Sequence, residues 1–116
     1  MFDKFIEISM LYGFYGGLLP EKQNLFLKAY YEDDCSLSEI AEQYGISRQG
    51  VHDNLSRAEA LLMNMEEKTG CVRRDLQCRK AAREIVNLAQ QLAEHSDHDV
   101  SLLAQRIMSA AGELEE

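Results

Sequence analysis

The sequence predicts an all-α fold, and three observations lead to that class. Apolar residues recur at helical spacing, no stretch alternates as a strand does, and one proline and seven glycines leave long uninterrupted segments in the 116 residues. All nine aromatic residues lie before residue 45, so we expect the dense core in the amino-terminal half. We therefore predict a helix-turn-helix domain over residues 1–70. A helical segment over 71–116 would pack on the long fourth helix or on a partner subunit.

The first two predicted helices build the base of the core. Residues 2–15 carry one apolar face, formed by Ile8, Leu11, Tyr12 and Tyr15. A second apolar side, formed by Phe2, Phe5 and Ile6, exceeds what a surface helix needs, so the helix is either fully buried or faces a partner. Two glycines after Tyr15 end it, and Pro20 begins the next helix. The expected inner face of that second helix is Leu25, Phe26, Ala29 and Tyr30.

The next two helices are marked by their caps. Ser36 and Glu39 have the spacing of a capping box, so a helix begins after Ser36, and Gly45 suits the left-handed residue that ends it. Ser47 then caps a fourth helix. Nothing interrupts this helix before Thr69, which gives it 22 residues and a length of about 33 Å. A small three-helix core cannot cover that length, so its carboxy-terminal half must pack on another surface.

Two further helices are expected to form a carboxy-terminal hairpin. The first covers residues 72–94, with Ile85, Leu88, Ala89 and Leu92 at helical spacing. Residues 95–99, HSDHD, form a polar turn. The last helix has Val100, Leu103, Ala104, Ile107 and Ala111 in register. In this half we expect helix-on-helix packing that buries Leu, Ile, Ala and Met.

Residues 36–58, SLSEIAEQYGISRQGVHDNLSRA, have the parts of a helix-turn-helix in the required order. Ala41 permits a close crossing of the two helices, and Ile46 and Val51 fix the second helix against the first. In this motif the amino-terminal end of the second helix meets phosphates and base edges in the major groove.

The predicted DNA contacts lie at the start of the fourth helix. Four side chains face away from the Val51–Leu55 stripe and are the expected base contacts: Arg48, Gln49, His52 and Asp53. Arg can read guanine, Gln can read adenine, and Asp can accept from cytosine. Ser47 and Arg57 are the expected phosphate contacts. The alternative is a solvated helix face, which Asp53 favours because a carboxylate near phosphates repels them.

Charge is distributed unevenly along the chain. The net charge is −8, which argues against a general nucleic-acid coat protein, and residues 36–58 hold only two arginines against three acids. Residues 68–83 nevertheless carry a net charge of +5. Four basic residues in this segment are predicted to contact a DNA or RNA backbone: Arg73, Arg74, Arg79 and Lys80. The alternative is pairing, within or between subunits, with acids such as Glu59, Glu66 and Glu67.

Two family resemblances add to this interpretation. Residues 19–51, LPEKQNLFLKAYYEDDCSLSEIAEQYGISRQGV, resemble region 4 of bacterial sigma factors. LYGFYGGLLPEKQ, YYEDDCSLSEIAEQYGISRQGVHDNLSRAEALL and the acidic end are more closely similar to the YlxM family, over residues 8–68. That resemblance implies a winged-less, sigma-region-4-like helix-turn-helix core with a long recognition helix. It also implies DNA binding, an association with the signal recognition particle pathway and no catalytic activity.

The chain departs from the sigma pattern at one position of the recognition helix. Sigma factors usually carry an apolar residue where this sequence has Asn54, and here the apolar residue moves to Leu55. We therefore expect a slightly rotated recognition helix, whose base contacts differ from those of sigma factors.

Other classes of protein find no support in the sequence. No apolar run reaches membrane-spanning length, and the first residues do not form a signal peptide. The three cysteines Cys35, Cys71 and Cys78 match no zinc or redox spacing, which indicates reduced thiols in a cytoplasm. The polar turn 95–99 imitates a metal cluster but lacks a third anchored ligand. There is no Gly-rich phosphate loop and no readable nucleophile–base pair, so we expect neither a cofactor nor catalysis.

The leading prediction is a cytoplasmic, non-enzymatic regulator that binds double-stranded DNA and forms a homodimer. The alternative is an adaptor for protein or ribonucleoprotein, such as signal recognition particle components, that keeps the helix-turn-helix as scaffold. The low positive charge of residues 36–58 separates the two. A DNA reader needs dimerisation or help from the basic segment, whereas an adaptor needs neither.

Overall fold

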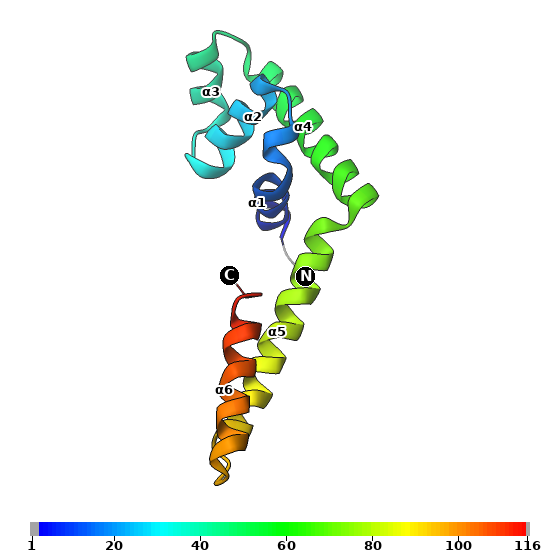
Figure 1. Ribbon diagram of the computed structural model, residues 1–116. Helices are drawn as coiled ribbons and strands as arrows, with labels where there is room; N and C mark the ends of the chain where they lie inside the picture. Colours follow the sequence, from blue (N-terminus) through cyan, green and yellow to red (C-terminus); the bar gives the residue numbers. More distant parts are fainter. Residues whose placement is uncertain (1–2, 116) are drawn as a thin grey trace. The chain divides into compact units, whose positions relative to one another are not determined.

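The computed structural model describes residues 3–115, and within that range its regular elements are all helical (Figure 1). The predicted all-α class is therefore confirmed. In chain order the elements are α1 (Lys4–Tyr15), the 3-10 turn η1 (Gly16–Leu18), α2 (Glu21–Leu27), the π-helical turn η2 (Lys28–Glu32), α3 (Leu37–Tyr44), α4 (Arg48–Thr69), α5 (Cys71–Ala93) and α6 (His98–Gly112). Phe2, expected on the second apolar side of the first helix, lies outside the described residues.

The chain divides into two compact units, residues 1–72 and 73–116. In the first unit α1, α2 and α3 all pack against α4. The largest fully buried side chains of this core are Phe26, Ile8, Leu27, Ile40, Leu62 and Val51. Their burial gives the unit a compact centre, with α4 as the element that every other helix contacts.

The inner face of α2 differs from the prediction at one position. Leu25 was expected to point inward but is 41% exposed, whereas Leu27 is completely buried. The inward face is centred on Phe26 and Leu27, and Leu25 lies about 200° around the helix from Leu27.

Helix α1 keeps part of its apolar surface exposed. Ile8, Leu11 and Tyr15 face the core as predicted. Phe5 and Ile6 are 47% and 46% exposed, so the interpretation of α1 as a fully buried helix is wrong.

The carboxy-terminal half of α4 packs on α1 of the same chain. The hydroxyl of Tyr15 donates to Oε1 of Glu66 at 2.6 Å and lies 2.6 Å from Oγ1 of Thr69. Glu66 also accepts from the backbone N–H of Val72 at 2.9 Å. At least part of the surface that this long helix was expected to need is therefore supplied within the first unit.

The second unit is a hairpin of α5 and α6, which run side by side in opposite directions (Figure 1). Its buried side chains are small: Ala82, Ala89, Ala104 and Ala111. Within a single chain the hairpin does not bury the leucines and isoleucines of the predicted stripes: Ile85, Leu88, Leu92, Leu103 and Ile107 are 42–59% exposed. Within residues 3–115, none of the helices has the length and apolar character that crossing a membrane requires.

Candidate nucleic-acid interface

The first helix of the motif, α3, is fixed at both ends by the predicted caps. The Ser36 hydroxyl accepts from the backbone N–H of Glu39 at 3.1 Å, and the Glu39 carboxylate accepts from the backbone N–H of Ser36 at 2.9 Å. The hydrogen bond from the Ser36 backbone N–H, together with the nearby Ser36 hydroxyl, holds the pKa of the Glu39 carboxyl below its usual range. Gly45 ends the helix in the left-handed conformation, at φ 66° and ψ 34°, and its N–H bonds to the carbonyl of Ala41. The predicted capping box and glycine turn are both confirmed.

The second helix of the motif, α4, begins at the predicted cap and in the predicted register. The Ser47 hydroxyl accepts from the backbone N–H of Gly50 at 3.0 Å. Val51 is completely buried and Leu55 is 5% exposed, so both face the core. Asn54 is half-buried, and its side-chain amide donates to the carbonyl of Gly50 at 2.8 Å. Leu55 therefore takes the inward position after Val51, and Asn54 bonds to its own helix.

The polar side chains of the first turns of α4 lie on the surface. The exposed residues of this face are Ser47, Arg48, Gln49, His52, Asp53 and Arg57. A shallow groove of about 350 Å³ runs beside them, lined by Leu37, Arg48, Gln49 and His52. Leu37 belongs to α3, so this groove brings together the starts of both helices of the motif.

Two of these side chains converge on Asp53. Nε2 of Gln49 donates to Oδ1 of Asp53 at 3.0 Å, and Nδ1 of His52 lies 3.7 Å from the same oxygen. The Asp53 carboxylate is thus engaged along its own helix. Sequence reasoning missed this pair, although Gln and Asp four residues apart on a helix are a recognisable signal for it.

A second groove opens between α1, η2 and α4. It has a volume of about 270 Å³ and is lined by Lys4, Phe5, Tyr30, Tyr31, Leu37, His52, Leu55, Ser56 and Glu59. The Tyr31 hydroxyl donates to Oε1 of Glu59 at 2.5 Å, and Nζ of Lys4 lies 3.8 Å from the same oxygen. Burial and the bond to Glu59 raise the pKa of Tyr31. Glu59, considered above as a partner of the basic segment, therefore has contacts within the first unit.

The basic segment, residues 68–83, runs from the end of α4 through the first half of α5, and its four predicted backbone contacts lie on α5. Nε of Arg79 donates to Oδ2 of Asp75 at 2.8 Å, and Nη1 of Arg79 donates to the carbonyl oxygen of Glu115 at 2.6 Å. Arg79 thus ties α5 to the residues that follow α6. Arg73, Arg74 and Lys80 are exposed.

The predicted polar turn, residues 95–99, caps α6, which begins within it at His98. Oδ1 of Asp97 accepts from the backbone N–H of Asp99 at 2.9 Å, and Nδ1 of His95 accepts from that of Asp97 at 3.0 Å. Among residues 3–115 no three His, Cys, Asp or Glu side chains gather as metal ligands. Cys35, Cys71 and Cys78 form no disulfide.

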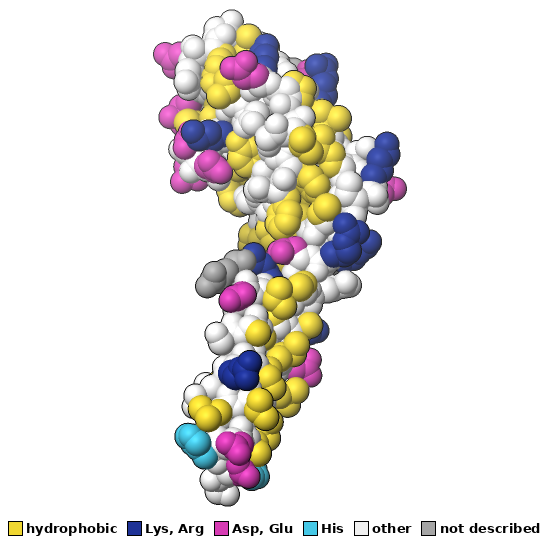
Figure 2. All heavy atoms as spheres, viewed as in Figure 1, with side chains coloured by type: hydrophobic (Ala, Val, Ile, Leu, Met, Phe, Trp, Pro, Cys, Tyr) yellow, Lys and Arg dark blue, Asp and Glu magenta, His cyan; other side chains and the backbone are white. Residues whose placement is uncertain are grey.

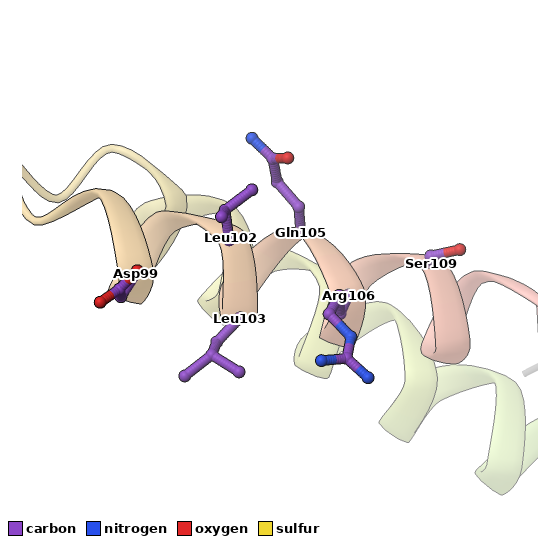
Figure 3. Close-up of a pocket in the computed structure, with 6 residues that line it drawn as sticks. All are labelled: Asp99, Leu102, Leu103, Gln105, Arg106 and Ser109. Carbon is purple, nitrogen blue, oxygen red and sulfur yellow. The ribbon is translucent and has the colours of Figure 1, made fainter.

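A surface hollow of the second unit is not an enclosed site. It measures about 530 Å³, and Figure 3 shows that its lining comes from α6 alone: Asp99, Leu102, Leu103, Gln105, Arg106 and Ser109. With no second element across from α6, the hollow is open surface.

The family model and the relatives that match this chain all belong to one family. Residues 2–104 match the family model UPF0122, described as "Putative helix-turn-helix protein, YlxM / p13 like". The chain is 49% identical over 85 residues to a UPF0122 protein of Desulforamulus reducens, which covers 73% of each chain. It is 50% identical over 74 residues to one of Geobacillus kaustophilus, covering 64% of this chain and 67% of the relative. It is 34% identical over 107 residues to one of Bacillus cereus, covering 92% and 96%.

Proposed function

The chain belongs to the UPF0122 family of helix-turn-helix proteins, and we propose that it binds double-stranded DNA through the amino-terminal end of α4. This proposal rests mainly on one observation. The left-handed Gly45 and the Ser47 cap present the start of α4 to solvent, while Val51 and Leu55 fix its other side to the core. A recognition helix held in this way can enter a major groove with its first turns leading.

Each exposed side chain has a chemical role in this proposal. Arg48 reads guanine through two parallel hydrogen bonds, and Gln49 reads adenine through its amide. Ser47 and Arg57 bind phosphates. His52, next to Asp53 in the sequence, adds a further base-edge contact.

Asp53 limits the affinity of this surface. Its negative charge opposes phosphate binding, although the hydrogen bond from Gln49 partly satisfies the carboxylate. In the bound state Gln49 exchanges its bond with Asp53 for a base edge, or Asp53 itself accepts from a cytosine.

Because the motif has few basic side chains, DNA binding requires additional phosphate contacts. In this proposal the exposed Arg73, Arg74 and Lys80, with Arg79 where its bond to Asp75 yields, bind the DNA backbone without reading sequence. A homodimer doubles the number of basic side chains and supplies two recognition helices for one DNA site. The exposed Phe5 and Ile6 of α1 are consistent with a protein that has a partner.

We place the protein in the cytoplasm as a non-enzymatic regulator, with a fold like sigma region 4 and a role linked to the signal recognition particle pathway. The alternative is an adaptor that binds protein or ribonucleoprotein, such as components of that particle, and keeps the helix-turn-helix as scaffold. The observation that favours the adaptor is charge: the chain has a net charge of −8, and its motif is slightly acidic.

Selection of duplexes from a random DNA pool, performed at low salt where phosphate attraction is strongest, tests the proposal. Enrichment of a common sequence supports DNA reading. If no duplex is enriched while a pull-down from bacterial lysate retains signal recognition particle components, the adaptor function replaces it.

A further inference from the structure

We propose that the hairpin of α5 and α6 pairs with the same hairpin of a second copy, forming an antiparallel four-helix bundle. The surface concerned, named here the hairpin face, consists of Ile85, Leu88, Leu92, Leu103 and Ile107. These side chains are 42%, 59%, 45%, 57% and 43% exposed. Figure 2 shows a run of hydrophobic side chains along this part of the molecule.

The two helices contribute to one and the same face. Ile85, Leu88, Ala89 and Leu92 of α5 line a single groove of about 210 Å³ together with Ile107 of α6. Leu103 is one helical turn before Ile107, so it lies on the same side of α6. The hairpin face is therefore continuous across both helices.

The spacing within the face is that of a coiled-coil seam. On α5 uncharged residues follow one another in alternating steps of three and four: Cys78, Ala81, Ile85, Leu88 and Leu92. On α6 the same steps give Val100, Leu103, Ile107 and Ala110, and Leu114 follows just after the helix ends. Repeats of this kind direct a stripe of side chains at a facing helix along its whole length.

The hairpin alone leaves this stripe without cover. The buried centre of the contact between α5 and α6 consists of alanines seven residues apart: Ala82 and Ala89 on α5, and Ala104 and Ala111 on α6. Small side chains let the two helices approach closely but bury little apolar area, and the larger side chains remain at the edge of the contact. A second layer of helices would bury them, as in a four-helix bundle.

A second copy fits this face in size and symmetry. The two helices of the hairpin have 23 and 15 residues and are each about 10 Å wide, so together they present about 560 Å². Stable interfaces of standard size bury about 800 Å² on each partner, so a dimer through this face belongs to the smaller specific interfaces. The stripe carries no Lys or Arg, which makes it unsuited to nucleic acid, and a two-fold axis brings identical apolar faces together.

Charge sets the direction of the pairing. The tip of the hairpin, residues 94–99, holds three acids, and no Lys or Arg occurs from residue 84 to residue 105. The open end, residues 73–83 and 113–116, has five bases and four acids. Placing tip against tip crowds six carboxylates together, whereas antiparallel pairing sets each tip against the basic segment of the other copy. The two-fold axis then passes near Ile85, at the centre of the α5 stripe.

This inference gives the proposed homodimer its interface, but it can be tested without DNA. Sedimentation equilibrium of the full chain should give about twice the 13.2 kDa chain mass. Leu88→Glu places a carboxylate in the interface and should raise the dimer dissociation constant at least about 30-fold. The matched control is Leu102→Glu. Leu102 is 44% exposed and lies about 100° around α6 from Leu103 and about 140° from Ile107, and Figure 3 shows Leu102 and Leu103 pointing in different directions.

The outcomes separate the two proposals. A wild-type chain that sediments as a monomer at all accessible concentrations overturns the inference, as does a dimer weakened equally by Leu88→Glu and Leu102→Glu. If the dimer forms as described but enriches no duplex, the DNA-binding proposal fails while this inference stands.

Cysteine cross-linking tests the same interface without relying on a disruptive variant. In a chain with Cys35→Ser, Cys71→Ser and Cys78→Ser, the further change Ile85→Cys should give an interchain disulfide on mild oxidation. A chain that keeps only Cys78 should not cross-link. Adding Leu92→Cys to that chain should allow a disulfide between the cysteine at 78 of one copy and the cysteine at 92 of the other. Efficient cross-linking through Cys78 alone, with none through Ile85→Cys, overturns the antiparallel arrangement.

Discussion

Gln49 and Asp53 are joined across one turn of α4, with Nε2 of the amide 3.0 Å from Oδ1 of the carboxylate. This bond connects the side chain proposed to read adenine with the one acid on the exposed face. It keeps the Gln49 amide ordered in the free protein, and it must open or be rearranged when a base edge is bound. The pair therefore bears on both affinity and base preference.

Replacing Asp53 by Asn should strengthen DNA binding. The substitution removes a negative charge beside the phosphates and keeps a side chain that can still accept from Gln49. The expected gain is about 0.5–1 kcal/mol, or two- to fivefold in affinity, in line with the energies of exposed charge pairs. Fluorescence anisotropy with the selected duplex measures it. Glu67→Gln makes the same charge change near the far end of α4, about 21 Å away, and should leave the affinity nearly unchanged.

The turn of the motif depends on Gly45. Its φ of 66° is strained for a branched side chain, so Gly45→Val should lower the free energy of unfolding by about 1–2 kcal/mol. Thermal melts measure the loss. Gly13→Ala is the control: it lies inside α1 with open space around its Cβ position and should be neutral or stabilising by up to about 1 kcal/mol. A Gly45→Val protein as stable as the wild type would show that the turn does not constrain the motif.

The capping box should make stability depend on pH. The lowered pKa of Glu39 arises from hydrogen bonds that the folded state gives to its carboxylate. Its stabilisation is therefore complete above the ordinary glutamate value of about 4.3 and is lost as the pH falls through the folded pKa. Urea unfolding between pH 6 and pH 3 should show a flatter profile for Glu39→Gln than for the wild type. Identical profiles would remove the capping box as a source of this dependence.

The contact between α1 and the end of α4 depends on Tyr15. Its hydroxyl bonds to Glu66 from a side chain that is only 5% exposed. Tyr15→Phe should lower the free energy of unfolding by about 1–2 kcal/mol, because the carboxylate loses one donor while its bond from Val72 remains. Chemical denaturation checks this. A change below about 0.5 kcal/mol would mean that apolar packing of the ring, not the hydroxyl, joins the two helices.

Local signals made the motif predictable. Ser36, Glu39, Gly45 and Ser47 determine where α3 and α4 begin and end, because each supplies a specific backbone partner or conformation. The 22 residues of α4 followed from the absence of any interruption before Thr69.

The remaining features depend on contacts that spacing alone does not encode. The π-helical turn η2 follows directly on α2, and Leu25 turned outward where a simple inner face was expected. In the hairpin the predicted stripes are present, but the helices meet through alanines and leave leucine and isoleucine on the surface. Helical periodicity identifies apolar stripes without specifying which partner covers them.

The most direct test of DNA reading by α4 compares Arg48→Ala with Lys80→Ala on the selected duplex and its single-base variants, across a range of salt concentrations. We expect Arg48→Ala to cost about 1–3 kcal/mol on the preferred duplex and to relax preference at one position. Lys80→Ala should weaken all duplexes alike and reduce the salt slope by about one. If Arg48→Ala binds the preferred duplex as tightly and as selectively as the wild type, the start of α4 does not read DNA.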